Sequence, residues 1–369
     1  MADMQPKLAL IGALGMLARE VRERAERAGY SVVPYDLPGF DLTNGDQVLA
    51  EMERVRPEVI INCAAYTNVD GAETEEALAT RVNGLGPGYL AEAAMAVGAV
   101  LVQISTDYVF DGCKSSPYLE TDPVGPLSAY GRSKLAGEQA ILASELERYF
   151  IVRTSWLYGP GGKNFVETIM RLAREREELR IVADQVGSPT YTGDLAEAIF
   201  RLLEIARDEE AVMKEPLRRG RDEEAVTMGP LRRSRDEVAV TMDPLRRCRD
   251  EVAVTMDPLR RCRDEENVTR HGFFITSSSS RSFGIYHFSN SGQCSWYEFA
   301  SEIVAQLQRR GEALKVKRVV PIRTEEYPLP APRPAYSIFS KEKYRLATGA
   351  EVPGWQDSLA RYLNSKENP

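Results

Sequence analysis

The sequence predicts an α/β protein whose main part is a doubly wound parallel sheet, followed by a smaller C-terminal α/β region. Two observations predict this fold class. Within residues 7–156, short apolar runs rich in β-branched residues alternate with segments of helical spacing. The runs are apolar on both faces, which is typical of parallel strands covered by helices on each side. We expect right-handed crossovers between these strands.

The expected elements follow one another in a regular order. Apolar runs predict strands at 7–13, 31–36, 58–65, 99–106 and 149–156, and helical spacing predicts helices at 18–29, 45–57, 86–99 and 131–147. Residues 164–206 fit a helix, a short strand, a loop and a second helix that ends near Ala206. The same patterns predict a strand at 284–290, a helix at 295–311, a strand at 315–322 and helices at 340–349 and 354–365.

A 14-residue repeat interrupts this order from Arg207 onward. It begins as RDEEAVMKEPLRRG and returns in near-identical copies as far as residue 270. Each full copy carries a proline, which breaks a continuous helix once per unit. We interpret residues 207–282 as a flexible insertion that is poorly ordered or loosely helical. The alternative interpretation is an interaction arm or an oligomerisation element.

Composition narrows the class of function. The chain has 369 residues, 43% of them hydrophobic, and a formal net charge of −8, which favours a soluble globular protein and argues against nucleic acid or an anionic membrane as partner. No apolar run reaches membrane-spanning length, and the N-terminus shows no signal pattern. The five cysteines lack metal-ligand or disulfide spacing, which predicts a cytoplasmic protein. With only two histidines, we expect no metal site.

A glycine turn after the first strand indicates a dinucleotide site of the Rossmann type. Gly12 and Gly15 allow a tight turn whose backbone approaches a pyrophosphate at a helix N-terminus. Ala18 stands where a third glycine would pack the helix on the strand. Asp36, at the end of the second strand, would accept hydrogen bonds from an adenosine ribose and favour NADH, or would be a solvated turn residue. Asp41 would contact adenine or cap the next helix.

The third strand ends in small residues. Ala64 and Ala65 would let a flat ring or a diphosphate approach the backbone. We therefore expect a dinucleotide-binding domain made of residues 1–160, 186–206 and 283–290. The remainder, residues 161–185 and 291–369, would form the substrate domain.

Tyr130 and Lys134 are the most informative residue pair. Four residues apart on a helix, they share one face. An ammonium beside a phenol lowers the phenol pKa, which would make Tyr130 a general acid for a carbonyl. Thr106 could hold the substrate oxygen. Taken alone, the pair also fits an exposed tyrosine beside a surface lysine.

The motifs together resemble a known family. They are GALGMLA (12–18), ISTDYVFDG (104–112), YGRSK (130–134), WLYG (156–159), SPTY (188–191) and RPAYS (333–337). In this order they are similar to the extended short-chain dehydrogenase/reductases and, within them, to the dTDP-4-dehydrorhamnose reductases. The resemblance covers about 290 residues and leaves the repeats outside.

The resemblance implies roles residue by residue. Thr106, Tyr130 and Lys134 match the catalytic trio. The positions that match cofactor contacts are Gly12, Gly15, Met16, Leu17, Asp41, Leu42, Ala64, Ala65, Tyr66 and Asn83, and those that match sugar-nucleotide contacts are Thr106, Asp107, Trp156, Arg333 and Ser337. The chain departs from the family at Tyr336 and at Phe339-Ser340, which leaves substrate preference open.

The implied activity is reduction of the C4 keto group of dTDP-4-dehydro-L-rhamnose by NADPH or NADH, with a dTDP-sugar as the bound partner and a homodimer as an option. Two alternatives stay open. One is a reductase of another 4-keto sugar nucleotide. The other is a nucleotide-binding regulatory subunit similar to that of methionine adenosyltransferase, against which the intact trio argues.

Overall fold

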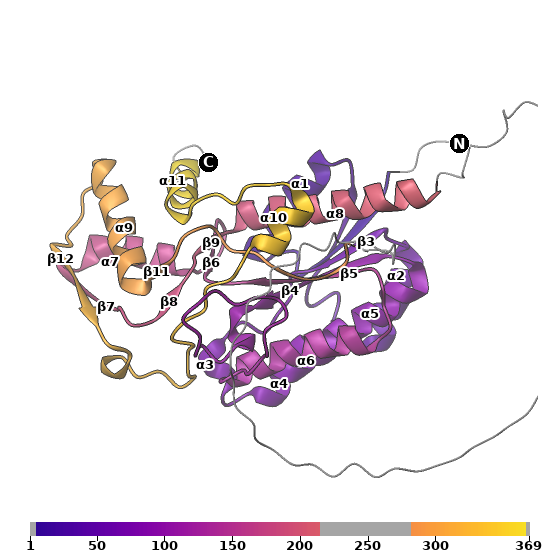
Figure 1. Ribbon diagram of the computed structural model, residues 1–369, viewed down its shortest axis with the longest axis horizontal. Coiled ribbons are helices and arrows are strands. Elements are labelled where there is room, and N and C mark those ends of the chain that lie inside the picture. Colours follow the sequence, from indigo (N-terminus) through magenta and orange to yellow (C-terminus); the bar gives the residue numbers. More distant parts are fainter. Residues whose placement is uncertain (1–4, 215–281, 367–369) are drawn as a thin grey trace, which may run out of the picture. The chain divides into compact units, whose positions relative to one another are not determined.

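A computed structural model describes residues 5–214 and 282–366 of the chain (Figure 1). The described residues, 5–214 and 282–366, form one compact unit. Most of the repeat insertion, residues 215–281, lies outside the described residues. The expectation that it is flexible therefore stays a prediction.

A six-stranded parallel sheet forms the centre of the unit. Its strands are β1 (Lys7–Ile11), β2 (Ser31–Tyr35), β3 (Val59–Asn62), β4 (Val100–Thr106), β5 (Tyr149–Thr154) and β10 (Gly284–His287). They lie in the order β10-β5-β4-β3-β1-β2, and each neighbouring pair is parallel. The predicted doubly wound sheet is confirmed.

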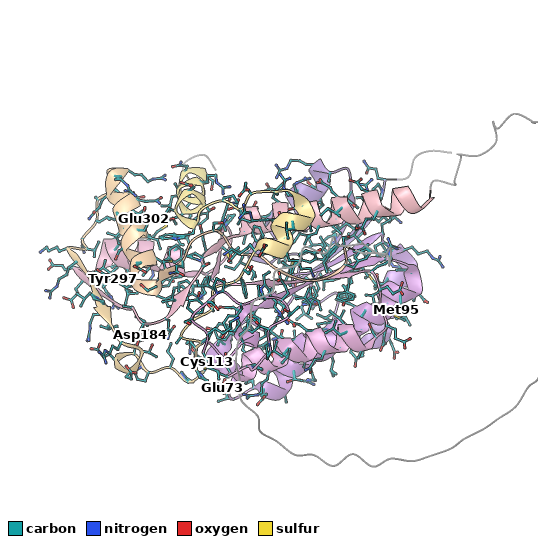
Figure 2. The ribbon with its side chains drawn as sticks, viewed as in Figure 1. Glu73, Met95, Cys113, Asp184, Tyr297 and Glu302 are labelled. Carbon is teal, nitrogen blue, oxygen red and sulfur yellow. The ribbon has the colours of Figure 1, made fainter. Side chains whose placement is uncertain are left out.

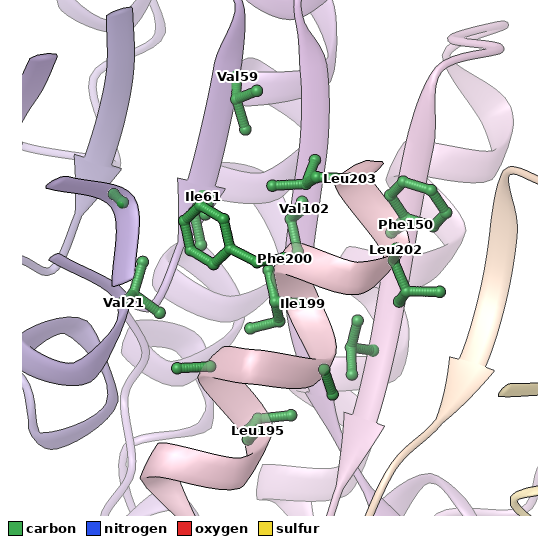
Figure 3. Close-up of a cluster of buried hydrophobic side chains, with 14 of the residues drawn as sticks. Val21, Val59, Ile61, Val102, Phe150, Leu195, Ile199, Phe200, Leu202 and Leu203 are labelled. Atoms are coloured by element: carbon green, nitrogen blue, oxygen red, sulfur yellow. The ribbon is translucent and has the colours of Figure 1, made fainter. Parts of the chain in front are cut away.

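Helices cover both faces of this sheet (Figure 1). One face carries α1 (Met16–Arg27), α8 (Thr192–Lys214) and α10 (Glu342–Thr348), and the other carries α2 (Gly45–Val55), α5 (Gly86–Val97) and α6 (Ala129–Ala143). Alternate residues of a strand serve the two faces: Leu8 and Leu10 pack in the first core, Ala9 in the second. Figure 3 shows the first core, where Ile199 of α8 lies among strand residues.

A separate hydrophobic core lies on the side of the C-terminal elements. It is built by α7 (Phe165–Glu175), β7 (Glu178–Val182), α9 (Trp296–Arg309), β12 (Arg318–Ile322) and α11 (Trp355–Ser365). β7 and β12 pair in parallel. A capping box at Ser295, with Glu298 as its partner, begins α9. Most of this second core comes from residues expected to form the substrate domain, and that domain assignment stays a prediction.

Several short elements were not predicted. They are α3 (Val69–Ala72), α4 (Glu76–Thr80), the π-helix η1 (Arg81–Leu85), the 3-10 helices η2 (Asp107–Val109) and η3 (Thr324–Glu326), and the two-residue strands β6 (Leu157–Tyr158), β8 (Val186–Gly187), β9 (Thr190–Tyr191) and β11 (Cys294–Ser295). The strand expected at 149–156 ends at Thr154, because Trp156 adopts a left-handed backbone with φ 48°.

The expected end of the last sheet-covering helix near Ala206 is wrong. Helix α8 continues through Lys214 and so includes the first eight residues of the first repeat unit. Where the chain returns, the carboxylate of Glu209 accepts hydrogen bonds from the backbone nitrogen and the hydroxyl of Ser282, each at 3.0 Å. The hydroxyl of Tyr286, in β10, donates to the carbonyl of Ser282 at 2.6 Å. The two ends of the insertion are thereby joined beside the sheet.

None of the helices in the described part of the chain has the length and apolar character needed to cross a bilayer.

Candidate active site

A cavity of about 770 Å³ runs along the carboxyl ends of β1 to β4. Its size and its place at the strand ends suit a dinucleotide in a doubly wound sheet. Its lining includes most of the expected cofactor and catalytic residues: Gly12, Gly15, Met16, Leu17, Asp36, Asp41, Leu42, Ala64, Ala65, Thr106, Asp107, Tyr130, Lys134 and Trp156. The structure therefore brings together residues spread over some 145 positions of the sequence.

The glycine turn is shaped by its backbone. Gly12 has φ +73°, and a Cβ there would lie 2.6 Å from the backbone nitrogen of Ala64, so only glycine fits. The Gly12 nitrogen donates to the Tyr35 carbonyl at 2.9 Å, which ties the turn to β2. Gly15 precedes α1, whose N-terminus no described side chain caps. The N–H groups of its first turn are left for an anion.

Two aspartates near this turn have structural partners. Asp36 accepts from the backbone nitrogens of Leu14 and Leu37, both at 2.9 Å, and so holds the glycine turn against the end of β2. Asp41 accepts from the nitrogen and hydroxyl of Thr43. It does not cap α2, because Asn44 does so. The expectation that Asp41 caps the helix is wrong, while both carboxylates still face the cavity.

Helix α6 presents Tyr130 because its N-terminus is fixed on three sides. Ser128 caps the helix. Glu73 (labelled in Figure 2) accepts from the Ala129 nitrogen at 2.8 Å. A Cβ at Gly131 would lie 2.3 Å from the Tyr108 carbonyl oxygen, so glycine lets α6 pack directly on η2. The ring of Tyr108 meets that of Tyr130 edge-on, with centroids 5.5 Å apart.

The electrostatics of Tyr130 differ from the prediction. Burial and the nearby charge of Asp107 raise the pKa of Tyr130 to about 12, although a hydrogen bond with Thr106 lowers it. The Lys134 ammonium donates to the Ile104 carbonyl at 2.6 Å and is not among the groups that shift the Tyr130 pKa. Burial lowers the pKa of Lys134 itself to about 8. A tyrosine with a high pKa keeps its proton at neutral pH and is suited to donate it.

Asp107 lies beside the trio and is only 2% exposed. Its Oδ1 accepts from the Thr106 hydroxyl at 2.9 Å. Burial raises the pKa of Asp107 to about 6, and the hydroxyls of Ser337 and Thr106 lower it in part. Ser337 is buried against this carboxylate and is not part of the lining of the cavity.

Tyr66 and Asn83 do not line the cavity. The Asn83 amide accepts from the Tyr66 nitrogen at 2.8 Å and donates to the Tyr66 carbonyl and the Ser133 hydroxyl, each at 3.0 Å. It thus ties the loop after β3 to α6 from the π-helix η1. The Tyr66 hydroxyl donates to Glu75 at 2.5 Å, at the surface. Tyr66 and Asn83 therefore support the segments that form the cavity and do not themselves face it.

A second cavity, of about 670 Å³, adjoins the C-terminal elements and shares Tyr108 with the first. Aromatic and aliphatic side chains of α7, β7 and α9 line it, together with the loop that carries Arg333. The Arg333 guanidinium forms a bidentate ion pair with Asp70 of α3, with both N–O distances 2.8 Å. The Arg333 guanidinium, which was expected to bind a diphosphate, is bound by the Asp70 carboxylate in this structure.

Trp156 and Trp296 form a wall between the two cavities. Their rings stack with centroids 3.5 Å apart and planes 8° from parallel. Trp156 lines the first cavity and Trp296 the second. A Cβ at Gly187 would lie 2.5 Å from the Trp156 ring, so glycine makes room for it. Sequence reasoning missed Trp296, whose signal was a lone tryptophan directly after a helix-capping serine.

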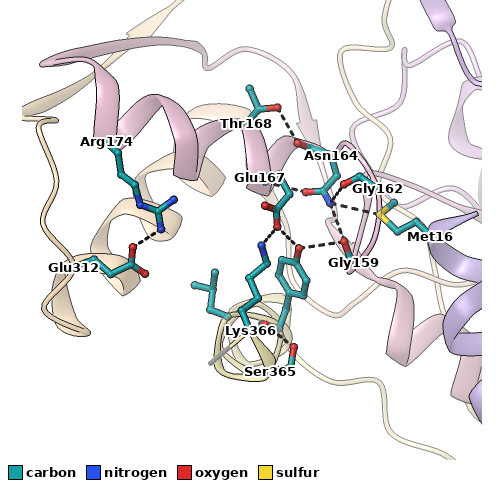
Figure 4. A network of polar contacts seen from close by, with 12 residues as sticks. Met16, Gly159, Gly162, Asn164, Glu167, Thr168, Arg174, Glu312, Ser365 and Lys366 are labelled. Carbon is teal, nitrogen blue, oxygen red and sulfur yellow. Dashed lines mark hydrogen bonds and ion pairs between the residues drawn. The ribbon is translucent and has the colours of Figure 1, made fainter. Parts of the chain in front are cut away.

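The glycine turn is also tied to α7. The Asn164 amide donates to the Gly159 carbonyl at 2.9 Å and meets the Met16 sulfur at 3.5 Å (Figure 4). The same side chain caps α7. Glu167, in the first turn of α7, forms an ion pair with Lys366. A single asparagine therefore links the cofactor-side helix α1 to the C-terminal elements.

No cluster of three or more potential metal ligands occurs within residues 5–214 and 282–366. The cysteines in these ranges, Cys63, Cys113 and Cys294, are free thiols.

Comparison with known proteins places the chain in a family. The family described as RmlD substrate binding domain matches residues 6–215 and 231–368. The chain belongs to this RmlD family. A dTDP-4-dehydrorhamnose reductase of Burkholderia thailandensis is 36% identical over 352 residues, which cover 95% of each chain. The spore coat polysaccharide biosynthesis protein SpsK of Bacillus subtilis is 33% identical over 362 residues, or 98% of each chain.

A solved structure supports the same assignment. The dTDP-4-dehydrorhamnose reductase of Bacillus anthracis, determined in complex with NADP, is 35% identical and superposes with a TM-score of 0.73, covering 98% of this chain and 100% of that one. The predicted membership of the extended short-chain dehydrogenase/reductases is confirmed, as is the prediction of an NAD(P)-dependent oxidoreductase of the RmlD family.

Proposed function

We propose that this protein reduces the C4 keto group of dTDP-4-dehydro-L-rhamnose to the alcohol, with NADPH or NADH as reductant. The observation that carries the proposal is the meeting of Thr106, Tyr130 and Lys134 on the lining of one cavity, next to a glycine turn built for a pyrophosphate. Family membership supplies the sugar-nucleotide class, and the named activity of the relatives supplies the sugar.

The first cavity fits a nicotinamide dinucleotide. The uncapped start of α1 and the close approach of Gly12 to Ala64 leave space and N–H donors for the pyrophosphate. Asp36 and Asp41 mark the adenosine end and Lys134 the nicotinamide end of the lining. When bound, the reduced nicotinamide supplies the hydride that the keto carbon receives.

The chain's own residues handle the proton. Tyr130 donates its phenolic proton to the oxygen as negative charge develops on it. The Thr106 hydroxyl, in hydrogen-bond contact with Tyr130, holds that oxygen in line. The buried ammonium of Lys134 lines the same cavity and is placed to hold the nicotinamide ribose.

We assign the second cavity to the dTDP-sugar. It meets the first at Tyr108, so a sugar held there reaches the catalytic tyrosine. Its aromatic lining, with Phe165 and Trp296, suits a planar base. Arg176 also lines it and can neutralise part of the charge of a diphosphate, whereas the Arg180 guanidinium is paired with Glu326. Arg333, paired with Asp70, fixes the loop above.

The test is an assay of the purified full-length protein against dTDP-linked 4-keto sugars, with NADPH and NADH supplied separately. We expect oxidation of the cofactor that depends on dTDP-4-dehydro-L-rhamnose and yields dTDP-L-rhamnose. Turnover restricted to another 4-keto sugar nucleotide would favour the alternative reductase, to which the departures at Tyr336 and Phe339-Ser340 point. Cofactor binding without turnover on any sugar would contradict the proposal and favour a regulatory subunit.

We further propose a cytoplasmic location, since the described cysteines are free thiols. Oligomeric state is tested separately by sedimentation, with a homodimer as the expectation.

A further inference from the structure

A buried charged network lies directly behind the catalytic residues and has no part in the mechanism above. Glu138 of α6 and Arg153 of β5 form an ion pair with side chains 2% and 3% exposed. The guanidinium donates to both carboxylate oxygens, with Nε 3.0 Å from Oε1 and Nη2 2.7 Å from Oε2. The hydroxyl of Ser105 donates to Glu138 Oε1 at 2.5 Å.

His287 closes the network on the far side. Its Nε2 lies 3.4 Å from Arg153 Nη1, and its Nδ1 lies 3.1 Å from the Tyr118 carbonyl oxygen. Because a carbonyl and a guanidinium N–H are its partners, the ring is the neutral tautomer that donates from Nδ1 and accepts at Nε2. Burial and the Arg153 charge hold the pKa of His287 well below its usual range. Glu138 therefore keeps the full charge of Arg153 as its counterion.

The network sets the register between α6 and β4. Lys134 and Glu138, one turn apart on α6, bond to successive residues of β4: the Ile104 carbonyl and the Ser105 hydroxyl. The next residue of the strand is Thr106. Two polar contacts thus fix the strand end that carries Thr106 against the helix face that carries Tyr130 and Lys134.

Glu138 also acts on Lys134 through its charge. The titratable groups that act on the Lys134 ammonium are Glu138, from its own helix, and Cys63, after β3. Tyr130 lies one turn earlier on α6, and β4 contributes only the Ile104 carbonyl. Burial lowers the pKa of Lys134, and the Glu138 carboxylate raises it again.

We propose that Glu138 is a positioning residue of the active site: held by Arg153 and bonded to Ser105, it fixes the helix face that carries Tyr130 and Lys134 against the strand end that carries Thr106, and places its negative charge one turn from the Lys134 ammonium. The proposal deepens the reductase function proposed above and rests on it for its catalytic meaning. Its structural part, the charge and placement of Lys134, can be measured without cofactor or sugar.

The first test follows the titration of Lys134 by NMR of protein labelled with carbon-13 at lysine Cε, with the resonance assigned through Lys134→Met. In Glu138→Gln we expect the midpoint of Lys134 to fall by about one pH unit, because a neighbouring opposite charge is lost. An unchanged midpoint in the folded variant would overturn the proposal. Because no substrate is present, this result does not depend on the reductase activity.

The matched control is Asp194→Asn. Asp194 is also a buried carboxylate beside an arginine, Arg361, at 2.7 Å, and it accepts from Ser358 and Asn290. It lies on α8, away from both cavities. This variant should lose stability as Glu138→Gln does, while the Lys134 midpoint and the pH profile of turnover stay as in the wild type.

A second variant separates positioning from folding. Glu138→Leu with Arg153→Met removes both charges and leaves none unpaired, so we expect a folded protein. It should bind NADPH, yet its kcat should fall at least tenfold and its alkaline limb should move to lower pH. A stable double variant with wild-type kcat and pH profile would refute the proposal.

Ser105→Ala keeps every charge and removes only the hydrogen bond between Glu138 and β4. It therefore tests the positioning role even if the charge variants do not fold. We expect kcat to fall several-fold while the KM of the cofactor and the Lys134 midpoint stay unchanged. Wild-type kcat in this variant would overturn the positioning role. If the wild-type protein shows no reductase activity, the proposed function fails, but the Lys134 titration still tests the Glu138 contact.

Discussion

The two cavities are built in different ways. Backbone geometry shapes much of the first, on the side of the glycine turn: Gly12 in a left-handed conformation, the bare start of α1 and the small residues after β3. Side chains shape the second, and they come from α7, β7, α9 and the loop at 324–333. Tyr108 is common to both.

This difference separates a general binding site from a particular one. A turn fixed by φ angles and close backbone contacts accepts any dinucleotide of the right shape, and few residue types satisfy it. A cavity walled by side chains can change its ligand by exchanging those side chains while the helices behind it stay in place. We therefore expect the second cavity to determine substrate preference. We expect the reduction itself to take place where the two cavities meet, at Tyr108 and the adjacent Tyr130.

Substitutions where the two cavities meet should reduce turnover the most. In Tyr130→Phe the phenolic proton is lost while the ring remains, so we expect kcat to fall by about 10²- to 10⁴-fold, the usual contribution of a general acid. NADPH binding, followed by fluorescence quenching, should be unchanged. Turnover close to that of the wild type would show that another group donates the proton and would refute the role assigned to Tyr130.

The backbone-built cavity can be tested at Gly12. Gly12→Ala places a Cβ within 2.6 Å of the Ala64 nitrogen, so we expect NADPH affinity to fall at least tenfold and the free energy of unfolding to drop. Gly29→Ala is the matched control, since Gly29 has φ +83° and nothing lies within 4 Å of its Cβ position. It should cost about 1 kcal/mol for the left-handed conformation and leave cofactor binding intact. Equal effects on binding in the two variants would mean that strain alone, not the close approach, governs this cavity.

The side-chain-built cavity can be tested at Trp296. Trp296→Leu removes the ring stacked on Trp156, and an aromatic pair contributes about 1 kcal/mol, so we expect the KM of the sugar nucleotide to rise about fivefold. The Kd of NADPH should not change. Tyr297→Leu, at the next position of α9 and outside the cavity lining (Figure 2), is the control that should leave KM unaltered. A rise in the Kd of NADPH instead would show that Trp296 also supports cofactor binding in the first cavity.

The last expected effect is on stability rather than on binding or turnover, and it concerns Asp107. Its pKa is raised to about 6 by burial, above the usual value, so the folded state binds this proton more tightly than the unfolded chain. The ionised carboxylate therefore costs stability above pH 6, and the cost disappears as the pH falls towards about 4. Asp107→Asn should be more stable than the wild type at pH 8 by about 3 kcal/mol, with the gain vanishing near pH 4. Denaturant unfolding at both pH values measures this, and a gain independent of pH would point to packing instead.

The contrast also explains what the sequence revealed. Gly12, Gly15, Tyr130 and Lys134 were predictable because a tight turn, a helix start and an i, i+4 pair are local patterns of few residue types. The parallel sheet was predictable from strand–helix alternation for the same reason.

The rest depended on contacts between distant segments. Trp296 meets Trp156 across 140 positions, and Arg333 is paired with Asp70 across 263. Nothing near Arg333 in the sequence indicates its carboxylate partner. Spacing alone predicted a lowered pKa for Tyr130, whereas burial and the Asp107 carboxylate raise it, and neither can be read from the i, i+4 pattern.

The junction of Glu209 with Ser282 has a consequence for how this protein can change over generations. Strand β10 starts there, next to Phe150 at the amino end of β5, whereas the cavities open at the carboxyl ends of the strands. Because the Glu209 carboxylate binds the returning chain at Ser282, we expect the start of β10 to stay in place whatever the number of intervening residues. Copies of the 14-residue unit could then be gained or lost at this position with little effect on the active site. The same junction is a suitable site at which to insert a reporter domain into this protein.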